Sequence, residues 1–196
     1  MTLPCTIVWD ADGVLFNTFD KSGEFQWSKT IVEDLKIDAT VLAHIFSADW
    51  DNVLRGTRDT RAHIREALKV CDSPISADEF IGYWLEKDSD VNLEVASYLN
   101  PALACIGTNQ DRLRTARISS LFEGRVRKVF ASSDIGHLKR EAGYFRFIER
   151  DLNLSPHELC LIDDTLQNVE TARSSGWAAH HFTDGETLKQ FLVALS

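Results

Sequence analysis

The stretch Thr6–Val14, TIVWDADGV, is an apolar run that ends in two carboxylates one residue apart, followed by a glycine. Isoleucine, valine and tryptophan favour a buried strand, whereas an aspartate is costly to bury without a partner. We therefore expect Asp10 and Asp12 at the exposed end of a strand, the edge at which α/β sheets hold their ligands. The alternative is a simple turn, in which both carboxylates only accept hydrogen bonds from nearby backbone N–H groups.

The composition favours a globular protein with few candidate macromolecular partners. The 196 residues, 44% of them apolar, suffice for one full core or for a core with a small accessory domain, and they exclude a disordered or fibrous chain. With 21 basic and 30 acidic residues, the net charge of −9 argues against nucleic acid and anionic membranes as partners. We find neither an uncharged apolar stretch of roughly 20 residues nor a signal peptide, and we expect a cytoplasmic protein.

The spacing of the four cysteines matches no known metal-binding or disulfide motif. Three of them, Cys5, Cys105 and Cys160, lie in apolar runs, where a thiol behaves as a small hydrophobic group. Because neither a CxxC motif nor a Cys/His ligand spacing occurs, we expect a reducing compartment, without a zinc site or a disulfide framework.

Five short apolar runs are predicted to be strands: 5–9, 102–107, 126–131, 159–162 and 178–182. Several of them lack polar alternation, which is typical of strands that helices cover on both faces. Segments with helical spacing follow each of the last four runs. This alternation predicts an α/β fold, a Rossmann-like doubly wound parallel sheet.

Residues 18–99 interrupt this alternation, because they show helical periods and almost no strand signal. Ser76 and Glu79 form a capping-box pattern at the start of the last helix in this region. A connection of this length is too long for a simple crossover loop. We therefore predict a core formed by 1–17 and 100–196, with an inserted helical cap domain at 18–99.

Polar residues also follow two of the later strand runs. Thr108 and Asn109 end one run, Asp163 and Asp164 end another, and Lys139 lies between these elements. Each has an ordinary explanation, as a helix cap or a surface cation. Because several parallel strands end at the same edge of a sheet, we expect these side chains to converge with Asp10 and Asp12.

In these motifs the sequence resembles the haloacid dehalogenase-like hydrolase superfamily. The matching motifs are Asp10–Val14, Thr108–Asn109, Lys139 and Asp163–Asp164, in the order found in the family. They span nearly the whole chain. The resemblance is strongest to sugar-phosphatase-like members that carry a small helical cap between the first two motifs.

The chain departs from the family pattern at two positions. The family lysine is commonly followed by proline, whereas Arg140 follows Lys139 here, so Lys128 and Arg140 are alternatives for this role. Ala11 replaces a residue that is usually bulkier, which leaves extra room beside Asp10.

The resemblance implies that Asp10 is a nucleophile that forms an aspartyl-phosphate and that Asp12 is the general acid and base. It further implies that Thr108, Asn109 and Lys139 bind the phosphoryl oxygens. Like charges about 4 Å apart repel by roughly 4 kcal/mol at an effective dielectric constant near 20, so a phosphate dianion needs a cation to enter. All-oxygen ligands favour Mg²⁺ over zinc. The implied ligands are Asp10, Asp12 through its carbonyl oxygen, Asp164, and Asp163 directly or through water.

The function favoured at this stage is a magnesium-dependent phosphatase for a small phosphorylated metabolite, with a sugar phosphate as one candidate. A phosphomutase and a haloacid dehalogenase use the same scaffold. Asp12 argues against the dehalogenase, because a departing halide needs no proton. A catalytically inactive binding protein is the alternative from another class. The oligomeric state is left open.

Two groups of residues in the inserted region have alternative interpretations. Four arginines recur at helical spacing: Arg55, Arg58, Arg61 and Arg65. They form either a surface face paired with nearby acids or, at Arg58, a contact with the leaving group of the substrate. Trp27, Trp50 and Trp84 either line a sugar pocket or, as is commoner for large aromatic residues, form the core of the cap.

Overall fold

The central feature of the fold is a five-stranded parallel sheet with the strand order β3-β2-β1-β4-β5. The structure, a computed structural model, describes residues 5–195. Each predicted run overlaps one strand, and β2 and β4 extend one residue beyond their runs: β1 (Thr6–Trp9), β2 (Ala104–Thr108), β3 (Val129–Ala131), β4 (Leu159–Asp163) and β5 (Ala178–His181). The prediction of a doubly wound parallel sheet is therefore confirmed.

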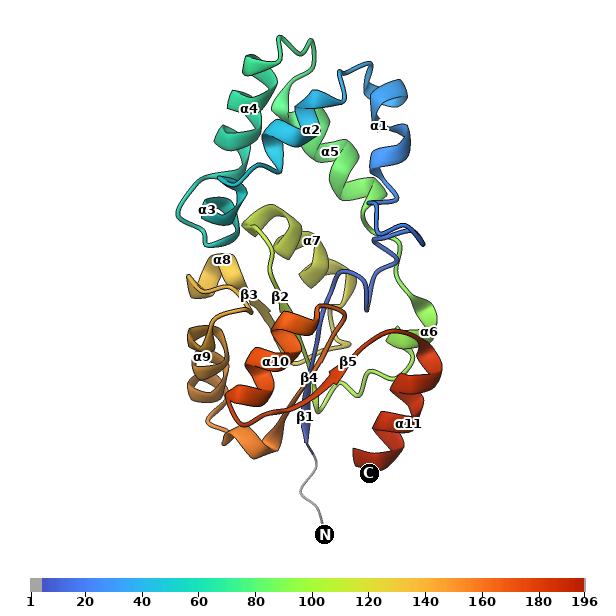
Figure 1. Cartoon of the computed structure of the whole chain (residues 1–196), viewed down its shortest axis with the longest axis vertical. Helices are drawn as coiled ribbons and strands as arrows, with labels where there is room; N and C mark the ends of the chain where they lie inside the picture. Colours follow the sequence, from blue (N-terminus) through green and yellow to red (C-terminus); the bar gives the residue numbers. More distant parts are fainter. Residues whose placement is uncertain (1–4, 196) are drawn as a thin grey trace.

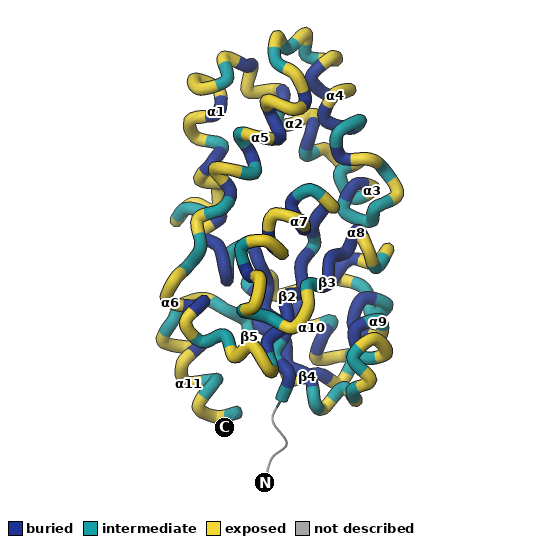
Figure 2. The backbone as a smooth tube through the Cα atoms, turned by 180° about the vertical axis from the view of Figure 1, so that it is seen from behind, coloured by how far each residue is buried: buried dark blue, intermediate teal, exposed yellow. Residues whose placement is uncertain are grey.

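Helices cover both faces of the sheet because successive strand residues point in opposite directions. Val8 belongs to the core on one face, with residues of α9 (Ala142–Leu152) and α10 (Leu166–Ser174). Its neighbour Trp9 belongs to the core on the other face, with residues of α7 (Arg112–Leu121) and α11 (Gly185–Leu195). Figure 2 shows the strands buried between these layers.

The helices of the inserted region stand above the carboxyl edge of the sheet (Figure 1). They are α1 (Ser28–Leu35), α2 (Thr40–Ile45), α3 (Trp50–Leu54), α4 (Thr60–Val70) and α5 (Ala77–Lys87), and we call this unit the cap. The cap has its own apolar core, which includes Ile31, Ile64 and Phe80. The predicted capping box is present, since the side chains and backbone N–H groups of Ser76 and Glu79 bond reciprocally.

Contacts with the sheet resume earlier than the boundary expected at residue 100. Phe16 forms isolated β-bridges with Asp12 and Val91, and α6 (Leu93–Ala96) buries Val95 and Ala96 in the core beside Trp9. The cause is the apolar face of α6, which is too short to bury that face by itself. In the part of the chain that the structure describes, no helix has both the length and the apolar character needed to cross a membrane.

The cap also contacts the core through α3 and α8 (Ser132–Ile135), far along the chain from the connecting segments. The hydroxyl of Ser132 donates a hydrogen bond of 2.6 Å to the carbonyl oxygen of Leu54. Arg55 forms a two-pronged ion pair with Glu141. The backbone passes so close that a Cβ atom at Gly56, where φ is +69°, would lie 2.1 Å from the carbonyl oxygen of Ser133.

Candidate active site

Three carboxylates meet where β1 and β4 end. The two strands are paired in parallel register, and the backbone N–H of Asp10 donates to the carbonyl oxygen of Ile162 at 2.8 Å. This pairing places Asp10 beside Asp163 and Asp164. One carboxylate oxygen from each of the three lies within 4.8 Å of the others. The sheet thus brings Asp10 close to two side chains that lie 153 and 154 residues later in the sequence.

Lys139 lies between two of these carboxylates. Its Nζ atom is 2.6 Å from Oδ1 of Asp10 and 2.7 Å from Oδ2 of Asp163, and its side chain is only 2% exposed. Asn168 donates to Asp163 at 3.0 Å and fixes the position of that carboxylate. The ammonium group therefore neutralises part of a buried acidic cluster.

The two alternatives to Lys139 lie elsewhere. Lys128 forms an ion pair with Asp151 at 2.7 Å. Arg140 forms an ion pair with Asp51 of the cap. The structure therefore brings only Lys139, of these three cations, to the strand-end carboxylates.

The cluster contains three carboxylates but only one ammonium group, so its negative charge is incompletely neutralised. Burial and the neighbouring charge of Asp163 raise the pKa of Asp10 well above its ordinary value, against the opposing effect of Lys139. The same two causes raise the pKa of Asp164. Burial by itself would lower the pKa of Lys139, but the charges of Asp10 and Asp163 raise it. A divalent cation held by the three carboxylates would lower the pKa of Asp10 and Asp164 again.

Gly13 lets the chain turn between these groups. Its φ angle is +73°, a conformation that residues with a Cβ atom rarely adopt. A Cβ atom at this position would lie 2.0 Å from Oδ2 of Asp164. The glycine is therefore required twice, for the backbone angle and for the close approach of Asp164.

Asp12 is held apart from the three-carboxylate cluster by its own set of donors. The Thr18 hydroxyl and the Arg114 guanidinium each donate to Oδ1 at 3.1 Å. The Gln110 side-chain amide donates to Oδ2. These three bonds fix the position of the Asp12 carboxylate. The backbone of Asp12 is only two residues along the chain from Asp10.

Arg114 connects Asp12 to the cap. Its side chain is fully buried, and its Nε atom lies 3.1 Å from Oδ2 of Asp88, the residue that directly follows α5. The guanidinium also stacks over the ring of Phe16 at 4.6 Å. Burial, and then the charge of Asp12, raise the pKa of Asp88 to about 7. The buried guanidinium of Arg114 thus pairs with Asp12 of the core and with Asp88 of the inserted region.

Thr108 and Asn109 lie at the end of β2, next to β1. The Thr108 hydroxyl is buried and has no hydrogen-bond partner among the described residues. The side-chain oxygen of Asn109 accepts a bond of 2.8 Å from the backbone N–H of Lys139, so Asn109 positions the lysine loop. Both residues are therefore at the predicted edge, beside the carboxylates.

A pocket of about 280 Å³ lies between this edge and the cap. Its polar lining residues are Asp12, Asp88, Asn109 and Gln110. Leu54 and six aromatic residues of the inserted region also line it: Phe19, Phe25, Trp27, Phe46, Trp50 and Trp84. The three tryptophans considered in the sequence thus line the pocket, and Trp27 and Trp84 also belong to the buried core of the cap.

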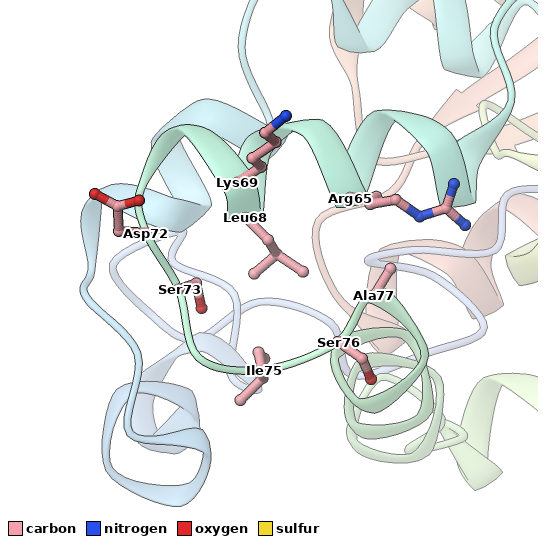
Figure 3. A pocket seen from close by; sticks show the side chains of 8 residues that line it. All are labelled: Arg65, Leu68, Lys69, Asp72, Ser73, Ile75, Ser76 and Ala77. Atoms are coloured by element: carbon pink, nitrogen blue, oxygen red, sulfur yellow. The ribbon is translucent and has the colours of Figure 1, made fainter.

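Arg58 lies outside this pocket lining. Its guanidinium contacts Asp49 at 3.4 Å and also pairs with Glu66, both on the cap. A second hollow, of about 540 Å³, lies at the corner between α4 and α5 (Figure 3). Leu68 points into it while Lys69 points away, and none of the strand-end residues lines it.

Sequence reasoning missed Gln110, Arg114 and Asp88 as parts of the site. Gln110 directly follows the Thr108–Asn109 motif, which is the one signal that pointed to it. Arg114 lies on a helix with Arg112 and Arg117, where an arginine is ordinarily solvated. Its burial arises only when the end of α5 brings Asp88 against the core.

Comparisons with known proteins identify the fold. A magnesium complex of a HAD family enzyme from Bacteroides thetaiotaomicron aligns with a TM-score of 0.78 over 96% of this chain and 98% of that one, at 16% identity. A complex of that enzyme with magnesium and inorganic phosphate gives 0.75 over 93% and 96%, also at 16% identity. L-2-haloacid dehalogenase from Xanthobacter autotrophicus gives 0.67 over 98% and 83%, at 15% identity.

The chain has the haloacid dehalogenase-like fold. The resemblance noted in the four motifs is therefore confirmed at the level of the fold. No family model matches the sequence. A drimenol cyclase from Aspergillus calidoustus is 35% identical over 49 residues, which are 25% of this chain and only 9% of that protein's length.

Proposed function

We propose that this protein is a magnesium-dependent phosphatase that hydrolyses a small phosphate monoester through an aspartyl-phosphate on Asp10. The observation that carries the proposal is the cluster of the buried Asp10 and Asp163 and the partly exposed Asp164, with Lys139 paired to the first two and Asp12 held separately. A HAD-fold enzyme crystallised with magnesium and inorganic phosphate supports the same chemistry.

The donor set fits Mg²⁺. The three carboxylates supply hard oxygen ligands and neither histidine nor cysteine, which is the set that Mg²⁺ prefers. The raised pKa values of Asp10 and Asp164 indicate that the cluster has room for more positive charge. Asp10, Asp164, Asp163 and the carbonyl oxygen of Asp12 would hold the ion, which would neutralise the charge of the phosphoryl oxygens.

The residues then divide the reaction into two steps. A carboxylate oxygen of Asp10 attacks phosphorus, the bond from phosphorus to the leaving oxygen breaks, and Asp12 gives its proton to that oxygen. In the second step Asp12 takes a proton from water, the water oxygen attacks phosphorus, and the bond to Asp10 breaks. Inorganic phosphate leaves, and both aspartates return to their starting states.

The remaining residues position the phosphoryl group. Lys139 supplies a fixed positive charge next to Asp10, and Asn109 holds the loop that carries it. A phosphoryl oxygen beside β2 would give the Thr108 hydroxyl the partner it lacks. Most of the rate would come from positioning and charge, as phosphoryl transfer generally requires.

A haloacid dehalogenase is the second candidate, because such enzymes share this fold. The three donors that hold Asp12 favour the phosphatase, since a halide leaving group has no use for a positioned acid. Phosphomutase activity would use the same two aspartates. Activity on a small phosphorylated metabolite, a cytoplasmic location and the lack of nucleic-acid and membrane partners stay predictions.

The deciding experiment compares wild type with Asp10→Asn. We expect phosphate release from p-nitrophenyl phosphate, a phosphate monoester, in the presence of Mg²⁺ by the wild type, and a loss of at least about 10³-fold in the variant, because an amide is not a nucleophile. Urea unfolding checks that the variant is folded. Release of chloride from 2-chloropropionate without phosphatase activity would contradict the proposal and favour the dehalogenase.

A further inference from the structure

The pocket above Asp12 has a chemical character that narrows the substrate. Its six aromatic rings form a continuous wall, with ring centroids 5.1 Å apart for Phe19 and Phe25, 4.9 Å for Phe46 and Trp50, and 6.0 Å for Trp50 and Trp84. Among the described residues that line the pocket, none is basic. The part supplied by the inserted region is therefore almost wholly apolar.

These rings are not simply the interior of the cap. Phe25 is 37% exposed, and Phe19, Phe46 and Trp50 are partly exposed, whereas the interior cap residues Ile31 and Phe80 are fully buried. Large apolar side chains that face a hollow rather than solvent or a packed core mark a ligand-binding surface. The hollow is small, about 280 Å³, which is near the lower limit for small-molecule sites.

The pocket has few polar groups, and several of them are already paired, although the Nε1 atom of Trp27 has no hydrogen-bond partner among the described residues. Gln110 donates to Asp12, and Asn109 accepts from the Lys139 loop. Asp88 accepts from the Trp84 indole and lies against Arg114. A sugar placed here would bury several hydroxyl groups against a largely aromatic lining that has few free polar groups, and each hydroxyl left unpaired would weaken binding.

We infer that the substrate is a phosphate ester of an apolar alcohol, whose hydrocarbon part occupies the aromatic pocket. The inference rests on the proposed phosphatase function. Asp12 lies where the pocket meets the carboxylate edge, so the oxygen that it protonates is the link between the phosphoryl group and the hydrocarbon. The pocket thus disfavours the sugar phosphates considered from the sequence.

A pair of esters with matched shape tests the inference. Cyclohexylmethyl phosphate and glucose 6-phosphate both carry a six-membered ring on a CH₂–O–phosphate group, but the first has no hydroxyl groups. We expect kcat/KM of the wild type with Mg²⁺ to be at least about 100-fold higher for cyclohexylmethyl phosphate, because each unpaired hydroxyl costs roughly tenfold in affinity. Equal or higher kcat/KM for glucose 6-phosphate would overturn the inference.

Variants locate the effect in the pocket. Phe25→Ala should lower kcat/KM for cyclohexylmethyl phosphate about tenfold, because it removes a ring from the hydrocarbon contact. Val70→Ala is the matched control, since Val70 is an exposed apolar residue of α4 outside the lining, and it should have no effect. An equal loss in the two variants would contradict the placement of the hydrocarbon.

A binding measurement separates this inference from the phosphatase proposal. Cyclohexylmethanol should change the tryptophan fluorescence of the wild type in a saturable manner, because three of the five tryptophans line the pocket, whereas glucose should not. Failure to release phosphate from any ester, p-nitrophenyl phosphate included, would refute the phosphatase function. Absence of the fluorescence change, with phosphate release intact, would refute the apolar pocket alone.

Discussion

Replacing Arg114 by methionine should strongly destabilise the protein. Methionine keeps a long unbranched side chain for contact with Phe16 but removes the guanidinium between Asp12 and Asp88. Each carboxylate lies 3.1 Å from the arginine, so each attraction amounts to roughly 5 kcal/mol at an effective dielectric constant near 20, before the cost of burial is subtracted. Removing one partner from a buried ion pair typically costs about 3–5 kcal/mol, and we expect a loss in that range.

Urea unfolding followed by circular dichroism at pH 7 measures this loss. The matched control is Arg112→Met, two residues away, where the side chain is exposed and lies 3.9 Å from Asp134. Exposed pairs contribute at most about 1 kcal/mol, so the control should unfold at nearly the wild-type urea concentration. Similar, small losses in both variants would refute the assignment of Arg114 as a buried charge partner of Asp12 and Asp88.

A second substitution in the same background identifies the cause of the loss. Asp88→Asn keeps an oxygen that accepts the Trp84 indole N–H but removes the carboxyl group that is left without Arg114. Because the pKa of Asp88 is about 7 even with Arg114 present, the double variant should recover part of the lost stability only at pH values well above 7, where this carboxyl group is charged. Phosphate release should not recover, because Asp12 still lacks the guanidinium that orients it. Recovery of activity with stability would show that Arg114 serves the fold alone.

Two further predictions concern charge in the site. Mg²⁺ should raise the melting temperature of the wild type but not of Asp164→Asn, and EDTA should abolish phosphate release; full activity in EDTA would contradict the proposed metal site. Burial raises the pKa of Asp88 to about 7 from 3.8, so the folded state holds this proton more tightly and its contribution to stability is lost as the pH rises through 7. The difference between urea midpoints at pH 5 and pH 8 should shrink in Asp88→Asn, and an unchanged difference would refute this origin.

The sequence predicted the elements that depend on local pattern. The apolar run before Asp10 and the apolar run before Asp163 each form a buried strand, and parallel pairing then requires their ends to meet. The same argument placed Thr108 beside them. The position of Lys139 was less certain from the sequence, because it lies in a loop whose path depends on Asn109 and on the packing of α9.

Features that depend on contact between cap and core were not predictable from local pattern. The spacing of arginines drew attention to Arg58, which pairs with acids on the surface of the cap. The arginine that reaches the site is Arg114, whose burial depends on Asp88 from the inserted region. Sequence periodicity reports the face of one helix and contains no information on which distant carboxylate that face meets.

The contact of α3 with α8 lies far from the two chain connections between the cap and the core. Both connections lie on the side of the molecule opposite to α3 and α8 (Figure 1). A rotation of the cap about those connections would separate the α3 side first. The pairs on that side are the ion pairs Arg55–Glu141 and Arg140–Asp51 and the hydrogen bonds from Ser132 to Leu54 and from Thr60 to Asp111. Because dissolved salt weakens exposed ion pairs, we expect higher ionic strength to favour separation of the α3 side.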